Sequence, residues 1–341
     1  MNKRMILYIQ GAILLIESAI MVLPIATALI YREPAGVWFF YTALAAAILG
    51  FAAMKLSKPR TKTIYAKEGL ITVALGWIVL SLVGALPFTL SVEIPFYLDA
   101  VFEMISGFTT TGSSILPNVE ALSRCMLLWR SFSHWLGGMG ILVFMLAIVK
   151  MEGGQGIHLL RAESPGPTVG KMVPRMVDSS KILYTIYFAL TLVQVVFYLA
   201  GGMPLFDSLC NAFATAGTGG FSIKADSFAS YSMYAQTVTT VFMALFGVNF
   251  SIYFFLLQKK FDLAFKNTEL RWYVGIILFS IAMITANILP MYPDFHAAIH
   301  HAAFSVSSVI TTTGFGTENF DLWPEFSRVI LVFLMIVGAS A

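Results

Sequence analysis

Long apolar runs dominate the chain and leave few folds open to it. Most of these runs are about 20 residues long, the length at which an α-helix crosses the hydrocarbon core of a bilayer. Only 11% of the residues are charged, whereas a typical soluble domain has about 25%. Closed β-barrels also cross membranes, but their strands alternate in hydrophobicity over segments of roughly ten residues. The sequence therefore predicts an all-α integral membrane protein.

Three shorter apolar segments, at residues 96–108, 204–213 and 296–310, cannot cross a bilayer. Each is followed by a loop of threonine and glycine, read as Thr-Thr-Thr-Gly-Ser-Ser, Thr-Gly-Gly-Phe-Ser and Thr-Thr-Thr-Gly-Phe-Gly in chain order. The unit of span, short helix, glycine loop and span therefore occurs three times, and internal repetition is strong information about a fold. The full spans are predicted at residues 5–30, 37–54, 69–90, 125–149, 182–201, 235–257 and 272–290, with a last apolar run at 326–337.

The loops predict a cation pore. Backbone that is not helical survives at membrane depth only when it is buried in protein or lines a water-filled path. Carbonyl oxygens on such a path can replace the water shell of an alkali cation, and glycine permits the backbone angles that this requires. One such loop is more often a helix cap or a close helix contact. Three copies, each between a short and a long apolar segment, favour one pore built from all of them.

Lysine and arginine residues set the expected orientation. Sixteen of the 21 lie at the N-terminus or in the stretches 55–67, 150–181 and 259–271. Because positively charged loops stay in the cytoplasm, the N-terminus is predicted to be cytoplasmic. This assignment requires each short segment to enter and leave by the outer face.

Other polar residues carry weaker predictions. Glu17 is an acid inside the first span, and we expect it to face the helix bundle or to make a buried hydrogen bond. The histidines His296, His300 and His301 resemble a metal pattern, but no cysteine or carboxylate set completes it. The chain has no nucleotide-binding glycine loop, dinucleotide motif or nucleophile elbow, so we expect neither an enzyme nor a cofactor.

Two further groups have plain structural interpretations. Cys125 and Cys210 are expected to be packing residues, and the glycines of the stretch 134–140 are expected to allow close helix packing. Acidic residues near the outer mouths could raise the local cation concentration or could simply be solvated. They are Asp99, Glu103, Asp207, Asp226, Asp294, Glu318, Asp321 and Glu325.

Five stretches together resemble the Trk/Ktr/HKT superfamily of potassium transporters, and the bacterial TrkH type in particular. The two extra N-terminal spans favour the TrkH type over the Ktr type. The resemblance covers essentially the whole chain, and the combination of stretches is very specific although each alone is not. They are Ser106–Gly112, Trp129–Gly140, Pro165–Leu183, Thr218–Ser222 and Thr311–Thr317.

The resemblance implies potassium uptake through a potassium-channel-like selectivity filter, in four repeats around one pseudo-fourfold pore. The chain departs from that pattern because it ends within the third repeat, without the fourth glycine loop or the basic residue that faces the filter. We therefore expect a C-terminally truncated chain that does not transport alone. The implied carbonyl ligands for potassium are Thr110, Thr111, Gly112, Thr218, Gly219, Gly220, Thr312, Thr313 and Gly314.

The expected domains follow the repeats. Residues 1–67 hold two transmembrane helices and a basic loop, 68–150 the first repeat, 151–258 a cytoplasmic linker and the second repeat, and 259–341 an incomplete third repeat. The resemblance also implies a homodimer in the bacterial inner (cytoplasmic) membrane and a nucleotide-binding, TrkA-like regulatory subunit on the inner loops.

Two other functions stay open at this point. One is a secondary transporter for another cation such as sodium, and the other is a non-transporting fragment. The three repeats share one orientation, which favours a pore over an inverted-repeat carrier.

Overall fold

The computed structural model describes residues 2–59, 66–138, 140 and 176–338. Within these ranges every regular element is an α-helix or a short 3-10 helix. Five of the described helices are long and apolar enough to cross a membrane, or six if one bent pair counts as a single span. The helices fall into two compact units, residues 1–184 and 185–341, and helix α9 (Met176–Ala200) belongs partly to each.

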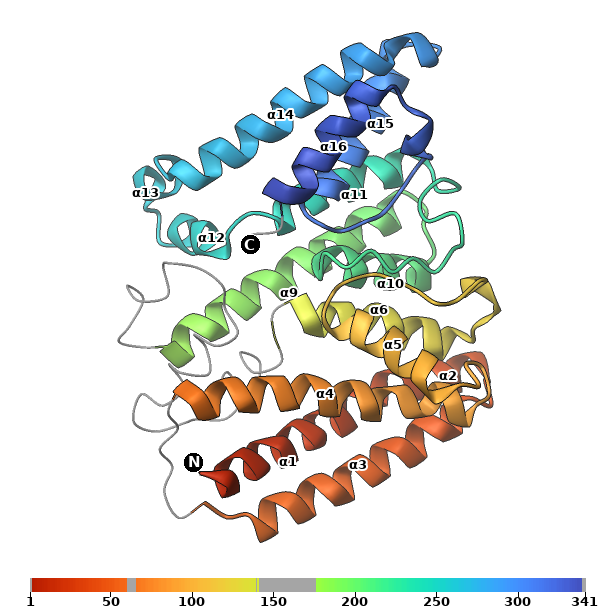
Figure 1. The fold of residues 1–341 in the computed structure, drawn as a ribbon, viewed down its shortest axis with the longest axis vertical. Helices are drawn as coiled ribbons and strands as arrows, with labels where there is room; N and C mark the ends of the chain where they lie inside the picture. The colour runs from red at the N-terminus through yellow and green to blue at the C-terminus, as the bar shows by residue number, and fades with distance from the viewer. Residues whose placement is uncertain (1, 60–65, 139, 141–175, 339–341) are drawn as a thin grey trace. The chain divides into compact units, whose positions relative to one another are not determined.

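In the first unit α1, α3 and α4 lie side by side (Figure 1). Helices α1 and α3 approach closely at Gly11 and Gly50, where a Cβ atom on either glycine would lie 2.7 Å from the carbonyl oxygen of the other. Small residues permit this approach between membrane helices. The elements are α1 (Lys3–Ile20), α2 (Val22–Tyr31), α3 (Gly36–Leu56), α4 (Ala66–Leu90), α5 (Tyr97–Phe108), η1 (Val119–Ala121) and α6 (Arg124–Gly138).

The short helix α5 is packed between α4 and α6 around a buried tryptophan. The Trp129 ring meets Phe39 and Phe108 edge-on, with ring centroids 6.0 Å and 6.2 Å away. Its indole nitrogen donates a 3.0 Å hydrogen bond to the Gly84 carbonyl oxygen on α4. Such aromatic pairs add to the free energy gained by burial, and they fix the position of α5.

The second unit carries two further short helices and their flanking long helices. Its apolar core lies among α14, α15 and α16, with Ile284, Ile288, Ala298 and Ala302 completely buried. The elements are α9, α10 (Leu205–Ala216), α11 (Met233–Phe246), α12 (Phe250–Leu257), α13 (Phe261–Phe265), α14 (Thr268–Ile288), η3 (Leu289–Met291), α15 (Phe295–Ile310), η4 (Phe320–Leu322) and α16 (Glu325–Val337).

The segment predicted as a span at 235–257 is bent, because α11 and α12 meet at an angle of 86°. Tyrosine hydroxyls donate to carbonyls beside the break: Tyr253 donates to Leu245 at 2.6 Å and Tyr273 to Ala244 at 2.9 Å. A broken helix is tolerated in a membrane when neighbouring groups supply such partners. The apolar pattern does not detect this break, since both pieces are apolar.

Some predicted segments lie outside the described residues. They include positions 60–65 of the basic loop, the end of the span 125–149, and most of the inner stretch 150–181.

Candidate functional site

The three short helices α5, α10 and α15 end in the same way. Thr110, Thr218 and Thr312 each adopt a left-handed conformation, with φ of 54°, 51° and 54°. In each copy the amide of this threonine donates to a carbonyl three residues earlier, and the next amide donates to a carbonyl five residues earlier. This is the Schellman motif, in which glycine usually holds the left-handed position. A β-branched residue there is a strained outlier, and the chain repeats it three times.

A second left-handed residue follows two positions later in every copy. Gly112, Gly220 and Gly314 have φ of 76°, 75° and 82°. The residue between the two left-handed positions does not have a positive φ in any copy. The loops therefore share one alternating backbone conformation, and glycine is required at its second left-handed position.

Threonine hydroxyls brace two of the loops from within. The hydroxyls of Thr109 and Thr111 lie 2.8 Å apart, and so do those of Thr311 and Thr313. Thr109 and Thr311 also donate to helix carbonyls four residues earlier, each at 2.7 Å. The second loop has glycine at both of these positions and lacks the hydroxyl pair.

The first loop is also held by a buried ion pair. Glu103 on α5 and Arg130 on α6 are almost completely buried, and the guanidinium Nη2 lies 2.5 Å from the carboxylate. The hydroxyl of Ser114 donates to the same carboxylate at 2.9 Å, and the amide of Ile115 donates to it at 3.1 Å. The pair therefore joins two helices to the chain that leaves the loop.

The second and third loops touch each other within the second unit. A Cβ atom added at Gly220 would overlap the carbonyl oxygen of Thr313, so the two backbones are in direct contact. Gly316 is bonded to the segment that follows the second loop. Its carbonyl oxygen accepts a 2.9 Å hydrogen bond from the amide of Phe228. The amide of Gly316 donates to the Ser227 hydroxyl at 3.1 Å. Backbone and side-chain hydrogen bonds thus fix the spacing of these two loops.

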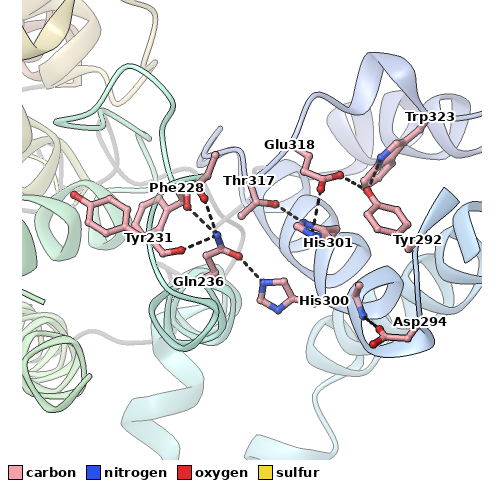
Figure 2. Close-up of polar contacts among 12 residues, drawn as sticks. Phe228, Tyr231, Gln236, Tyr292, Asp294, His300, His301, Thr317, Glu318 and Trp323 are labelled. Carbon is pink, nitrogen blue, oxygen red and sulfur yellow. Dashed lines mark hydrogen bonds and ion pairs between the residues drawn. The ribbon is translucent and has the colours of Figure 1, made fainter. Parts of the chain in front are cut away.

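A histidine on α15 holds the end of the third loop (Figure 2). His301 Nδ1 lies 3.0 Å from the Thr317 hydroxyl, and Nε2 lies 3.3 Å from the Glu318 carboxylate. Tyr292 stacks on the His301 ring and hydrogen-bonds Glu318, and it accepts a hydrogen bond from Trp323 at 3.1 Å. Burial and the nearby Glu318 raise the pKa of Tyr292, so the hydroxyl stays a neutral donor.

The adjacent His300 contacts α11, the helix that follows the second loop. Its Nε2 lies 2.7 Å from the side-chain oxygen of Gln236, whose amide nitrogen donates to the carbonyls of Phe228 and Tyr231 (Figure 2). Burial and the neighbouring His301 lower the pKa of His300, which favours its neutral form.

Glycines on the following helices pack against the ends of two short helices. A Cβ atom at Gly137 would overlap the Phe108 carbonyl oxygen, and one at Gly338 would overlap the Ile310 carbonyl oxygen. These carbonyls belong to the last turns of α5 and α15. The predicted close packing by glycine is confirmed at Gly137.

The model of the TrkH family, described as a cation transport protein, matches residues 37–341. The chain belongs to the TrkH family. It is 35% identical to the Trk system potassium uptake protein TrkH of Escherichia coli K12, over 100% of this chain and 72% of the relative. It is 31% identical to an uncharacterized cation transporter of Methanocaldococcus jannaschii, over 98% of this chain and 68% of the relative.

Its fold is similar to the crystal structure of the potassium transporter TrkH from Vibrio parahaemolyticus. The TM-score is 0.85 at 30% identity, and the match covers 98% of this chain and 70% of that one. The resemblance read from the glycine loops is therefore confirmed, and so is the predicted all-α fold of repeated short helices and loops.

The structure brings six of the nine predicted filter residues of this TrkH-family chain into one unit. Residues 218–220 and 312–314 lie in the second unit, where their loops are in contact. Residues 110–112 lie in the first unit and share the same backbone conformation. The matching φ angles give all three loops a common backbone shape.

Sequence reasoning missed the side chains that hold the loops. Glu103 was expected among the acids of the outer mouth, but it forms a buried pair with Arg130. The available signal was a charged residue inside an apolar segment, which normally faces a partner. His301 likewise braces a loop, and no group of His, Cys, Asp or Glu in the described residues could hold a metal.

Glu17 is completely buried, so the prediction that it faces the bundle is confirmed. Neither of its carboxylate oxygens has a hydrogen-bond partner among the described residues. Cys125 and Cys210 are both buried, as expected of packing residues.

Proposed function

We propose that this chain takes up potassium across the cytoplasmic membrane through a filter of backbone carbonyls. The observation that carries the proposal is the strained turn that recurs at Thr110, Thr218 and Thr312. Strain of this kind persists only where surrounding structure imposes it, and it concentrates at functional sites. The relatives named as potassium uptake proteins support potassium as the cation.

The proposed ligands are the carbonyl oxygens of the nine loop residues. Left-handed residues alternate with ordinary ones along each loop, and this alternation lets successive carbonyls face one side of the chain. A dehydrated potassium ion needs several such oxygens to replace its water. The C-terminal ends of α5, α10 and α15 add partial negative charge beside the loops. The ligands are Thr110, Thr111, Gly112, Thr218, Gly219, Gly220, Thr312, Thr313 and Gly314.

The proposal includes a topology and partners. The N-terminus is cytoplasmic, because the basic stretches then share one side. The repeats divide the chain at residues 68–150, 151–258 and 259–341, after two N-terminal spans in 1–67. The protein is a homodimer of the bacterial inner membrane, and the inner stretches 150–181 and 259–271 receive a nucleotide-binding, TrkA-like subunit.

Growth of a bacterium that lacks its own potassium uptake systems tests the proposal. The chain is expressed as it stands and as a chimera that carries the C-terminal part of the Escherichia coli relative. We expect growth on low potassium from at least one of these proteins. Gly112→Asp should abolish it, because a side chain and a charge would enter a loop that needs φ of 76°.

Gly275→Ala is the matched control, since a Cβ atom at this helical glycine has no neighbour within 4 Å. It should support normal growth. Sodium-dependent growth or uptake in place of potassium would contradict the choice of ion. Absence of any cation uptake from both well-expressed proteins would contradict the proposal as a whole.

A further inference from the structure

We infer that Glu103 and Arg130 are positioning residues of the first loop and set its preference for potassium over sodium. The inference rests on the proposed filter and goes beyond it, because neither side chain is a ligand. Both lie behind the loop: Glu103 on the short helix α5 and Arg130 on the following helix α6.

The carboxylate of Glu103 is fully engaged. It accepts a 2.7 Å hydrogen bond from Arg130 Nε and lies 2.5 Å from Nη2 of the same guanidinium. It also accepts from the Ser114 hydroxyl and from the Ile115 amide. Charge-assisted hydrogen bonds are stronger than neutral ones, and two parallel bonds also fix the orientation of the carboxylate relative to the guanidinium. One carboxylate therefore clamps the chain two and three residues after Gly112.

Burial makes the clamp rigid. The Glu103 side chain is 0% exposed and the Arg130 side chain 2% exposed. Movement of Ser114 or Ile115 away from the carboxylate would therefore remove hydrogen bonds from a buried charge, which is costly. The clamp acts on the chain that leaves the loop, because Ser114 and Ile115 belong to it.

The equivalent positions of the other loops hold no ion pair. When the copies are aligned on their glycines, Glu103 corresponds to Asn211 and Ser305. The second and third loops instead contact each other through Gly220 and Thr313. A filter must keep its carbonyls at a spacing that suits one ion and rejects a smaller one. The ion pair supplies this constraint to the first loop from its own repeat.

The test compares Glu103→Gln with Glu93→Gln. The Glu93 carboxylate accepts from the Ser123 amide and hydroxyl, both at 2.8 Å, and so holds the start of α6 but not the loop. Uptake of potassium and of sodium is measured for each variant in whichever protein supports growth. Purified protein is also heated in potassium and in sodium, because an ion that binds the folded state stabilises it.

We expect Glu103→Gln to reduce the preference for potassium over sodium by about tenfold or more, the effect of one lost charge-assisted hydrogen bond. The extra thermal stability in potassium should shrink in parallel. Glu93→Gln should retain both. Arg130→Lys keeps the charge but loses the planar fork, and its preference should lie between wild type and Glu103→Gln.

If Glu103→Gln does not accumulate, the double variant with Arg130→Met removes both charges and avoids an unpaired buried guanidinium. Wild-type ion preference in either accumulated variant, whatever its yield, overturns the inference and leaves the proposed function standing. A wild-type protein that shows no preference between the ions in uptake or in stability overturns both. A lost preference in Glu103→Gln with a retained one in Glu93→Gln supports the inference.

Discussion

The first and third loops have the same backbone conformation but are held by different chemistry. The first is clamped by a carboxylate and a guanidinium that are buried, and the charge of arginine does not titrate in proteins. The third is held by His301 and Glu318, whose side chains are 15% and 40% exposed. The same turn can thus be supported by a buried ion pair or by a partly exposed histidine and carboxylate.

Within the same comparison, one serine position behaves differently in the two loops. Ser308 donates a 2.6 Å hydrogen bond to the Phe315 carbonyl of the third loop. Ser106, at the aligned position before the first loop, has a hydroxyl without a hydrogen-bond partner among the described residues. The third loop therefore has a serine hydrogen bond that the first loop lacks, whereas the first loop has the buried ion pair.

The largest expected effect separates the two clamps directly. Arg130→Met should lower the free energy of unfolding of its unit by about 3–5 kcal/mol, because it leaves the buried Glu103 carboxylate without its cation. His301→Asn should cost no more than about 1 kcal/mol, since its partner is partly solvated. The melting temperature of each variant, followed as the loss of monodisperse protein on heating, measures both losses of stability. Equal shifts in melting temperature would remove the distinction between the loops.

The next effect concerns the bracing of the third loop by the second. Gly220→Ala should destabilise the second unit by about 1–3 kcal/mol, because the new methyl group would overlap the Thr313 carbonyl oxygen. Gly314→Ala has the same left-handed backbone but no neighbour within 4 Å, so only the conformational cost of about 1 kcal/mol applies. The same heating assay compares them with Gly275→Ala. A larger loss at Gly314 would show that the loops are not in contact.

A smaller effect distinguishes the two aligned serines. Ser308→Ala should cost about 1 kcal/mol, the net contribution of one buried hydrogen bond. Ser106→Ala should be neutral or slightly stabilising, because its hydroxyl is buried without a partner. The melting temperatures of the two variants provide the measurement. A destabilised Ser106→Ala would mean that this hydroxyl does have a partner.

The smallest effect is a dependence on pH in the third repeat. The pKa of His300 is lowered in the folded protein, so the folded state favours the neutral ring. Its contribution to stability is present above the unfolded pKa of about 6.5 and is lost as the pH falls below that value and through the lower pKa of the folded state. Acidification should therefore lower the melting temperature of wild type more than that of His300→Asn.

His296→Asn is the matched control for this pH effect, because His296 is exposed on the same helix. Its melting temperature should follow wild type at every pH. A wild-type response in His300→Asn would assign the pH dependence to another group, of which His301, Glu318 and Tyr292 are the titratable neighbours.

Sequence alone determined the class of fold and the position of the loops. The bilayer admits only helices or closed barrels, so the lengths of the apolar runs were sufficient to assign five of the spans that the structure describes. The threefold recurrence of a short segment and a glycine loop then identified the short helices to within a few residues. The unusual backbone at Gly112, Gly220 and Gly314 could be expected from the sequence, because glycine accepts a positive φ more readily than other residues do.

The tertiary structure decided which side chains meet. Glu103 and Arg130 are 27 residues apart, and nothing local in either helix indicates that they pair. Likewise only packing showed that His301 braces Thr317 and that the chain bends between α11 and α12. Apolar patterns report how far a segment can extend through a membrane. The partner of a side chain depends on how neighbouring helices are placed and turned, and that is fixed by contacts between residues distant in the sequence.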